Sequence, residues 1–190
     1  MSASPQFPGL PPGWVEETSY LANETIFYRQ FRRTDSTRRG RGLFIVHGFG
    51  EQSDRFLHFP HYLHTSVDII GLLDLPGHGK STGQRGHIDS FSKYSEASLI
   101  AFRHFEAQGR SYLGDLQLHL MGASMGGLVS LRTLLREPNL KLKSCIVAEA
   151  MLDIAVKVPW LKEKFGLWIA PIWGKGSEKR KPMASLTVKS

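Results

Sequence analysis

The 190-residue sequence has only one cysteine, Cys145, so the chain cannot form an intramolecular disulfide. A low cysteine content fits a reducing compartment, where disulfides are rare. Cys145 begins a short apolar run, residues 145–148. We therefore expect it to behave as a small buried hydrophobic residue.

A long hydrophobic run is also missing. The longest candidate, residues 165–173, is interrupted by Gly166 and Pro171 and is much shorter than the roughly 18 apolar residues that span a bilayer. The first residues, 1–5, have neither the basic nor the apolar segment of a signal peptide. We expect a soluble, cytoplasmic protein, with peripheral membrane association left open.

Acidic residues are scarce near the C-terminus. Residues 175–190 contain five lysines and arginines against Glu178 alone, and so carry more than half of the formal net charge of +7. A second basic cluster spans residues 32–41. Clusters of this kind usually form solvated surfaces, and we do not expect nucleic-acid binding.

Strand-like and helix-like patterns alternate along the chain. Two early strand-like runs, 15–21 and 25–31, predict a hairpin. Short apolar runs of the buried-strand type follow at 43–46, 67–73, 116–121 and 143–148. Helical spacing is found around 54–64, 91–108 and 125–136. This alternation predicts an α/β fold, with a mostly parallel sheet that has helices on both faces and begins with an antiparallel hairpin.

The chain is long enough for one domain with a substantial core. We expect an irregular leader at 1–13, the core at 14–149, a partial lid at 150–173 and a disordered basic tail at 174–190. The lid segment combines charged residues with apolar bulk from Trp160, Leu161, Phe165 and Trp168.

The chemically most informative segment is the G-x-S-x-G motif Gly122-Ala123-Ser124-Met125-Gly126. It follows a predicted strand and precedes a predicted helix. The motif is a weak signal by itself. Its position between a strand and a helix makes it more specific, because this arrangement places a serine on a strained turn at the positive end of a helix dipole. The two glycines allow the strand and the helix to approach closely. The Met125 N–H then points toward the place where an oxyanion would form.

Two other glycine-rich loops follow predicted strands. The loop His47-Gly48-Phe49-Gly50 lies where a second oxyanion-hole donor is expected, and the Phe49 N–H is our candidate. We interpret His47 as a structural histidine. The second loop, 74–81, contains Asp74 and His78, which either stabilise the loop or form a catalytic dyad; we favour the stabilising role.

Three segments, HGFGEQS, DLPGHGKSTGQRGHIDSF and LMGASMGG, occur here in an order and spacing that resemble the monoacylglycerol lipase and lysophospholipase group of α/β-hydrolases, often described as serine aminopeptidase-like. The resemblance covers about residues 24–173. It implies an α/β-hydrolase fold with Ser124 as nucleophile and with Met125 and Phe49 as oxyanion donors. It also implies that the substrates are carboxylic esters of single-chain lipids, that no metal or cofactor is needed, and that a lid follows residue 148.

The sequence departs from this pattern after the nucleophile. In this fold the acid and the histidine of the triad follow the serine, but all eight histidines of the chain precede Ser124. The only later aspartate, Asp153, lies at the entry to the lid. We therefore find neither the acid nor the histidine, and expect a fold that is incomplete at its C-terminus and a chain impaired in catalysis. A truncated reading frame, a short isoform and a pseudoenzyme all remain open.

Two alternatives to an ester hydrolase are a non-catalytic remnant that binds lipid or a protein partner, and an interaction protein that uses its basic tail. If the lid lacks its normal cover, its aromatic residues leave an exposed apolar patch. Such a patch favours self-association or peripheral membrane contact.

Overall fold

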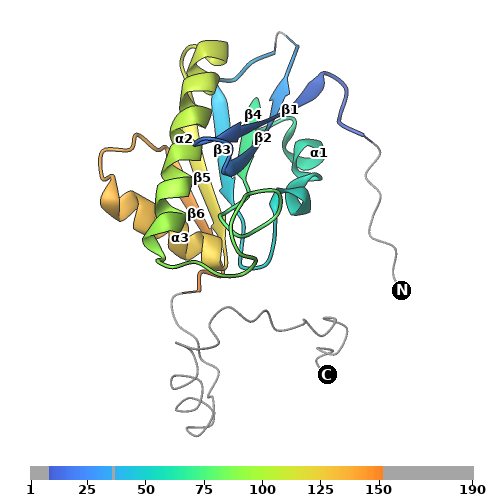
Figure 1. Cartoon of the computed structure of the whole chain (residues 1–190). Helices are drawn as coiled ribbons and strands as arrows, with labels where there is room; N and C mark the ends of the chain where they lie inside the picture. Colours follow the sequence, from blue (N-terminus) through green and yellow to red (C-terminus); the bar gives the residue numbers. More distant parts are fainter. Residues whose placement is uncertain (1–8, 36, 152–190) are drawn as a thin grey trace, which may run out of the picture. The chain divides into compact units, whose positions relative to one another are not determined.

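The computed structural model describes residues 9–35 and 37–151. Nearly all of the expected lid, and the whole of the expected basic tail, lie outside these residues. The described part contains a six-stranded sheet and three α-helices (Figure 1). The strands are β1 (Trp14–Leu21), β2 (Ile26–Arg33), β3 (Arg41–Val46), β4 (Ile69–Leu73), β5 (Gln117–Ala123) and β6 (Ser144–Ala148).

The sheet has the strand order β1-β2-β4-β3-β5-β6. The expected hairpin is confirmed, because β1 pairs antiparallel with β2, which in turn pairs antiparallel with β4. The other three pairings are parallel. Val46 aligns with Gly122, and Ala123 aligns with Ala148, so β3, β5 and β6 end at the same edge of the sheet. The loops that follow these strands are thereby brought together.

The two faces of the sheet have separate cores. Along β3, Phe44 and Val46 pack in one cluster, whereas Leu43 and Ile45 pack in the other, as the alternation of side chains in a strand requires. The helices α2 (Ser92–Leu113) and α3 (Met125–Arg136) supply the first cluster. The second cluster receives residues from a 3-10 turn, η1 (Ser53–Phe56), and from α1 (Phe59–Leu63). Figure 1 shows α2 and α3 on one side of the sheet and α1 on the other.

The helices differ from expectation in two places. The helix expected around residues 54–64 is divided into η1 and α1. Pro60 explains the interruption, because proline lacks an N–H and its ring clashes with the carbonyl four residues earlier, whereas it is well tolerated in the first turn of α1. Helix α2 runs five residues past the expected end and stops at Gly114, which has a φ of 74°.

The expected burial of Cys145 is wrong, because this residue is exposed. Strand β6 pairs with β5 on one side only and lies at the edge of the sheet formed by the described residues. Its neighbours Ile146 and Val147 are 48% and 37% exposed. The apolar run correctly indicated a strand, but within the described residues no further layer covers it.

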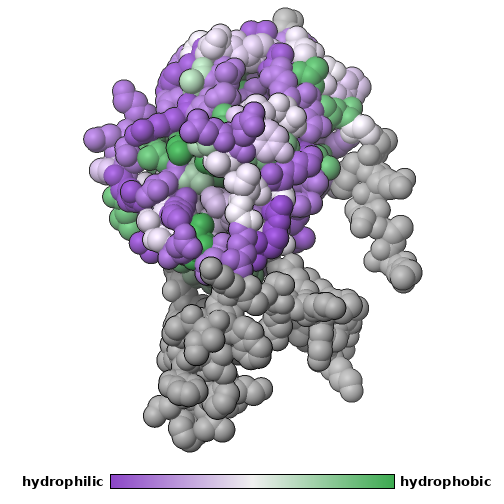
Figure 2. All heavy atoms as spheres, in the orientation of Figure 1, coloured by the Kyte–Doolittle hydropathy of each residue, from purple (hydrophilic) through white to green (hydrophobic). Residues whose placement is uncertain are grey.

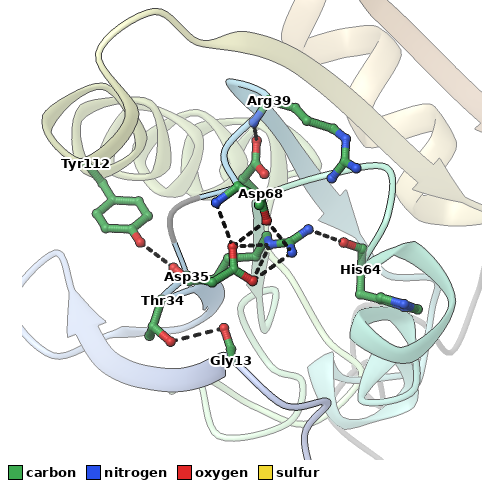
Figure 3. A network of polar contacts seen from close by, with 9 residues as sticks. Gly13, Thr34, Asp35, Arg39, His64, Asp68 and Tyr112 are labelled. Atoms are coloured by element: carbon green, nitrogen blue, oxygen red, sulfur yellow. Dashed lines mark hydrogen bonds and ion pairs between the residues drawn. The ribbon is translucent and has the colours of Figure 1, made fainter.

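A polar network fixes the start of the parallel strands (Figure 3). The Asp68 carboxylate accepts hydrogen bonds from the backbone N–H groups of Arg39 and Arg41, at 2.8 and 3.0 Å. The Arg33 guanidinium pairs with Asp35, and the Tyr112 hydroxyl donates to the Arg33 carbonyl. These contacts join β2, β3 and the end of α2 at the edge of the sheet opposite the G-x-S-x-G turn.

The surface of the described region is mainly polar on the side shown in Figure 2, with hydrophobic residues in small separate groups. None of the described helices is long and apolar enough to cross a bilayer. The apolar patch expected around the lid falls on residues 152–173, outside the described part.

Candidate active site

Ser124 lies between the end of β5 and the start of α3, as the motif predicts. Its φ of 52° and ψ of −120° are unusual for a residue with a side chain, and such strain is characteristic of functional turns. The flanking glycines are required by space. A Cβ atom on Gly122 would lie 2.4 Å from the Gly126 carbonyl oxygen, and one on Gly126 would lie 2.1 Å from that of Val46.

The turn is held from the side of β6. The Ser124 N–H donates to the Ala148 carbonyl at 2.9 Å, and the Met151 N–H donates to the Ser124 carbonyl at 3.1 Å. The segment that leaves β6 therefore wraps around the turn. It carries Glu149, whose φ of 49° is also in the left-handed region.

The loop after β3 lies against the serine from the other side. A Cβ atom placed on Gly48 would lie 3.3 Å from the Ser124 Cβ. Phe49, the next residue, is 50% exposed. Within the described residues, neither the Phe49 N–H nor the Met125 N–H donates a hydrogen bond. Neither N–H is therefore engaged by another described residue.

His47 connects this loop to the loop after β4. Its Nε2 accepts the Leu75 N–H at 2.9 Å, so Nδ1 carries the proton and donates to the Gly48 carbonyl at 2.7 Å. Burial, together with a smaller effect of the nearby His78, lowers the pKa of His47 to about 4. A buried, neutral histidine with both nitrogens satisfied fits the structural role expected for it.

Asp74 makes a second connection between the same two loops. One carboxylate oxygen accepts the Ser53 N–H at 2.6 Å, and the other accepts the Lys80 N–H at 2.7 Å. His78 makes a contact of 3.0 Å between its Nδ1 and the Pro76 carbonyl. Because backbone donors occupy both oxygens of Asp74, the contacts support loop stabilisation rather than a catalytic dyad.

A cavity of about 950 Å³ opens at Ser124. Part of its lining is apolar, including Leu10, Phe56 and Phe59. The polar part contains charged residues that we did not predict as site residues from the sequence: Glu16, Glu51, Asp54, Arg55 and Glu149. Glu51 lies within HGFGEQS, so the motif offered a signal for it. Glu149 is brought to the cavity by the pairing of β5 with β6, which single-residue patterns do not specify.

Within the described part of the chain, no side chain forms a hydrogen bond with the Ser124 hydroxyl. His47 and His78 are both buried beside the loop after β4. Asp153 lies outside the described residues. Among residues 9–35 and 37–151, no group of three or more His, Cys, Asp or Glu side chains is arranged to hold a metal ion.

Comparison with known proteins identifies a family. The model of the family "Serine aminopeptidase, S33" matches residues 39–188, well over half of the chain. Phospholipase YtpA of Bacillus subtilis (strain 168) is 31% identical over 119 residues, which are 61% of this chain and 42% of that protein. Monoglyceride lipase of Homo sapiens is 30% identical over 97 residues, which are 51% of this chain and 31% of the lipase.

Solved structures agree on the fold. The monoacylglycerol lipase of Paleococcus ferrophilus superposes with a TM-score of 0.53 and 25% identity, over 77% of this chain and 51% of the lipase. The peroxisomal α/β-hydrolase Lpx1 of Saccharomyces cerevisiae gives a TM-score of 0.59 at 18% identity, over 78% of this chain and 48% of Lpx1, which supports the fold alone. The chain spans about half, or less, of the length of these relatives.

Proposed function

Because the chain belongs to the serine aminopeptidase S33 family of α/β-hydrolases, we propose that it is a serine hydrolase of single-chain lipid esters, of the monoacylglycerol lipase or lysophospholipase type. The lipases and the phospholipase among its relatives support a lipid ester as substrate. The observation that carries the proposal is the strained Ser124 turn, which lies beside the loop after β3 and opens into a cavity.

In this proposal, the Ser124 hydroxyl attacks the ester carbonyl; the bond to the alcohol breaks, the alcohol leaves with the serine proton, and an acyl-serine intermediate forms. Water then attacks the acyl-serine, releases the carboxylic acid and restores the hydroxyl. The Met125 and Phe49 N–H groups stabilise the negative charge that develops on the carbonyl oxygen. Gly122 and Gly126 keep the turn tight. The apolar lining of the cavity accommodates the acyl chain. None of these steps needs a metal or a cofactor.

Turnover by the 190-residue chain is expected to be slow. A serine hydroxyl is a weak nucleophile unless a base accepts its proton, and no histidine follows Ser124. Loss of one triad member typically lowers kcat by about 10⁴-fold, although the oxyanion hole and substrate binding preserve a residual rate. The reactivity of the Ser124 hydroxyl and the rate of catalytic turnover are therefore separate properties of this chain.

A fluorophosphonate probe tests the proposal. We expect slow, stoichiometric labelling that is abolished by Ser124→Ala and unchanged by Ser111→Ala, which removes an exposed hydroxyl on α2. Hydrolysis of short p-nitrophenyl esters should be little faster than with Ser124→Ala. Labelling that survives Ser124→Ala, or no labelling of the unsubstituted chain, would contradict Ser124 as the nucleophile.

A second candidate function is a non-catalytic protein that binds lipid or a partner. It is favoured by one observation, namely that no base contacts the Ser124 hydroxyl within the described residues. Absence of labelling together with retained binding of single-chain lipids would favour this alternative. Peripheral membrane contact through residues 150–173 stays a prediction under either function.

A further inference from the structure

The cavity at Ser124 contains more negative than positive charge. Four carboxylates line it, from Glu16, Glu51, Asp54 and Glu149, against the single guanidinium of Arg55. His58 also lines the cavity. Burial lowers the pKa of His58, which favours its neutral form.

Two of these carboxylates share one cation. The buried Arg29 guanidinium lies 3.3 Å from Glu16 and also pairs with Asp54. Glu51 has its own partner, because its Oε1 lies 2.8 Å from the Arg55 Nε. After these pairs are counted, one negative charge remains on the set of Glu16, Asp54 and Arg29.

Glu149 contributes the other uncompensated charge. It takes part in none of the ion pairs among the described residues. Glu149 directly follows Ala148, whose carbonyl accepts the Ser124 N–H. This hydrogen bond holds the backbone next to Glu149 close to the nucleophile. Counting both guanidinium groups, the described residues around the cavity carry two unbalanced negative charges.

We propose that this cavity selects esters by the charge of their alcohol part. It accepts uncharged alcohols, binds cationic ones more tightly and disfavours those that carry a phosphate. This inference rests on the proposed function and narrows its substrate class toward esters without an anionic head group. The formal net charge of the whole chain, +7, has the opposite sign, so non-specific attraction would produce the reverse order.

The expected effect is moderate, because the carboxylates are partly exposed to water. Two unit charges about 7 Å from a ligand charge, in a medium close to water, change an affinity by on the order of fivefold. Salt weakens the effect, so the measurement belongs at low ionic strength.

The test uses three amphiphiles with the same tail: decyltrimethylammonium, decanol and decyl phosphate. Dissociation constants are measured by calorimetric titration of the full chain below the micellar range. We expect decyltrimethylammonium to bind about fivefold more tightly than decanol, and decyl phosphate about fivefold more weakly. Glu149→Gln should roughly halve the ratio between the cationic and the neutral ligand.

Asp115→Asn is the matched control. It also removes one exposed negative charge, but just before β5, at the end of the strand opposite Ser124. It should leave the ratio unchanged. Equal affinities, tighter binding of decyl phosphate, or equal effects of the two substitutions would overturn the inference.

The inference and the proposed function fail in different ways. Ser124→Ala should abolish fluorophosphonate labelling while preserving the order of the three affinities. If the three affinities follow the expected order but the unsubstituted chain is not labelled, the charge selection is supported and the hydrolase proposal is contradicted. If labelling occurs but the order of the three affinities is reversed, only the charge selection is contradicted.

Discussion

Protonation of His47 should make the stability of this protein depend on pH. The imidazole accepts the Leu75 N–H through Nε2, and it has no room for a second proton while that hydrogen bond exists. Substitution by glutamine tests this, because the amide oxygen can still accept a hydrogen bond but cannot be protonated near neutral pH. The variant loses the bond from Nδ1 to the Gly48 carbonyl, so at pH 7 we expect it to be less stable by about 1–2 kcal/mol.

The magnitude follows from the pKa of His47. Burial lowers it from the ordinary value of 6.5 to about 4 in the folded chain. As the pH falls, the unfolded chain therefore binds the proton first. The stabilisation is fully present above pH 6.5 and is lost as the pH falls toward about 4. At 1.36 kcal/mol per pKa unit, His47 accounts for about 3 kcal/mol over this range.

Urea unfolding followed by tryptophan fluorescence, at several pH values between 7 and about 4, provides the measurement. Other groups titrate over the same range, but they do so in both proteins, and the difference between the two isolates His47. The free energy of unfolding of the unsubstituted chain should fall relative to that of His47→Gln by about 3 kcal/mol. A difference that does not change with pH would refute the buried, neutral state of His47.

Three further outcomes are expected. Gly126→Ala places a methyl group against the Val46 carbonyl, and should cost about 3 kcal/mol in urea unfolding and abolish fluorophosphonate labelling; normal labelling would contradict the tight turn. Asp74→Asn should cost about 1–3 kcal/mol and speed amide hydrogen exchange at Ser53 and Lys80; unchanged exchange would count against the connection between the loops. Through the aromatic residues of its lid, the chain should bind anionic vesicles or self-associate, and Trp160→Ser with Trp168→Ser should weaken both; a monodisperse, non-binding chain would contradict this.

The sequence predicted the elements that local patterns define. Helix α3 has the expected bounds, Met125–Arg136, because the strained turn at Ser124 and Pro138 delimit it. The strands of the parallel sheet lie within a few residues of their apolar runs. The division at Pro60 was also visible in the sequence, since proline is confined to the first turn of a helix. The helical spacing of the residues around Pro60 predicted one continuous helix instead.

Features that depend on long-range contacts were not predictable. Cys145 lies in a run that is apolar enough for burial, but burial requires a covering layer, and the identity of a residue does not reveal whether one exists. The negative charge of the cavity also depends on a contact between segments that are distant in the sequence. Glu149 reaches Ser124 only because β6 pairs with β5 in the observed register. A pattern within one segment contains no information about that register.

Two requirements of a serine hydrolase can be considered separately at Ser124: stabilisation of an oxyanion and transfer of a proton. The strained turn, its glycines and the loop after β3, which carry the proposed nucleophile and the proposed oxyanion donors, all precede residue 151. Proton transfer needs a base, which within the described residues does not contact the hydroxyl. His47 and Asp74 hold the loop after β3 in place through hydrogen bonds that involve no later residue. The proposed oxyanion donors therefore do not depend on a base for their position. For this reason we expect labelling of Ser124 and catalytic turnover to respond differently to the same substitutions.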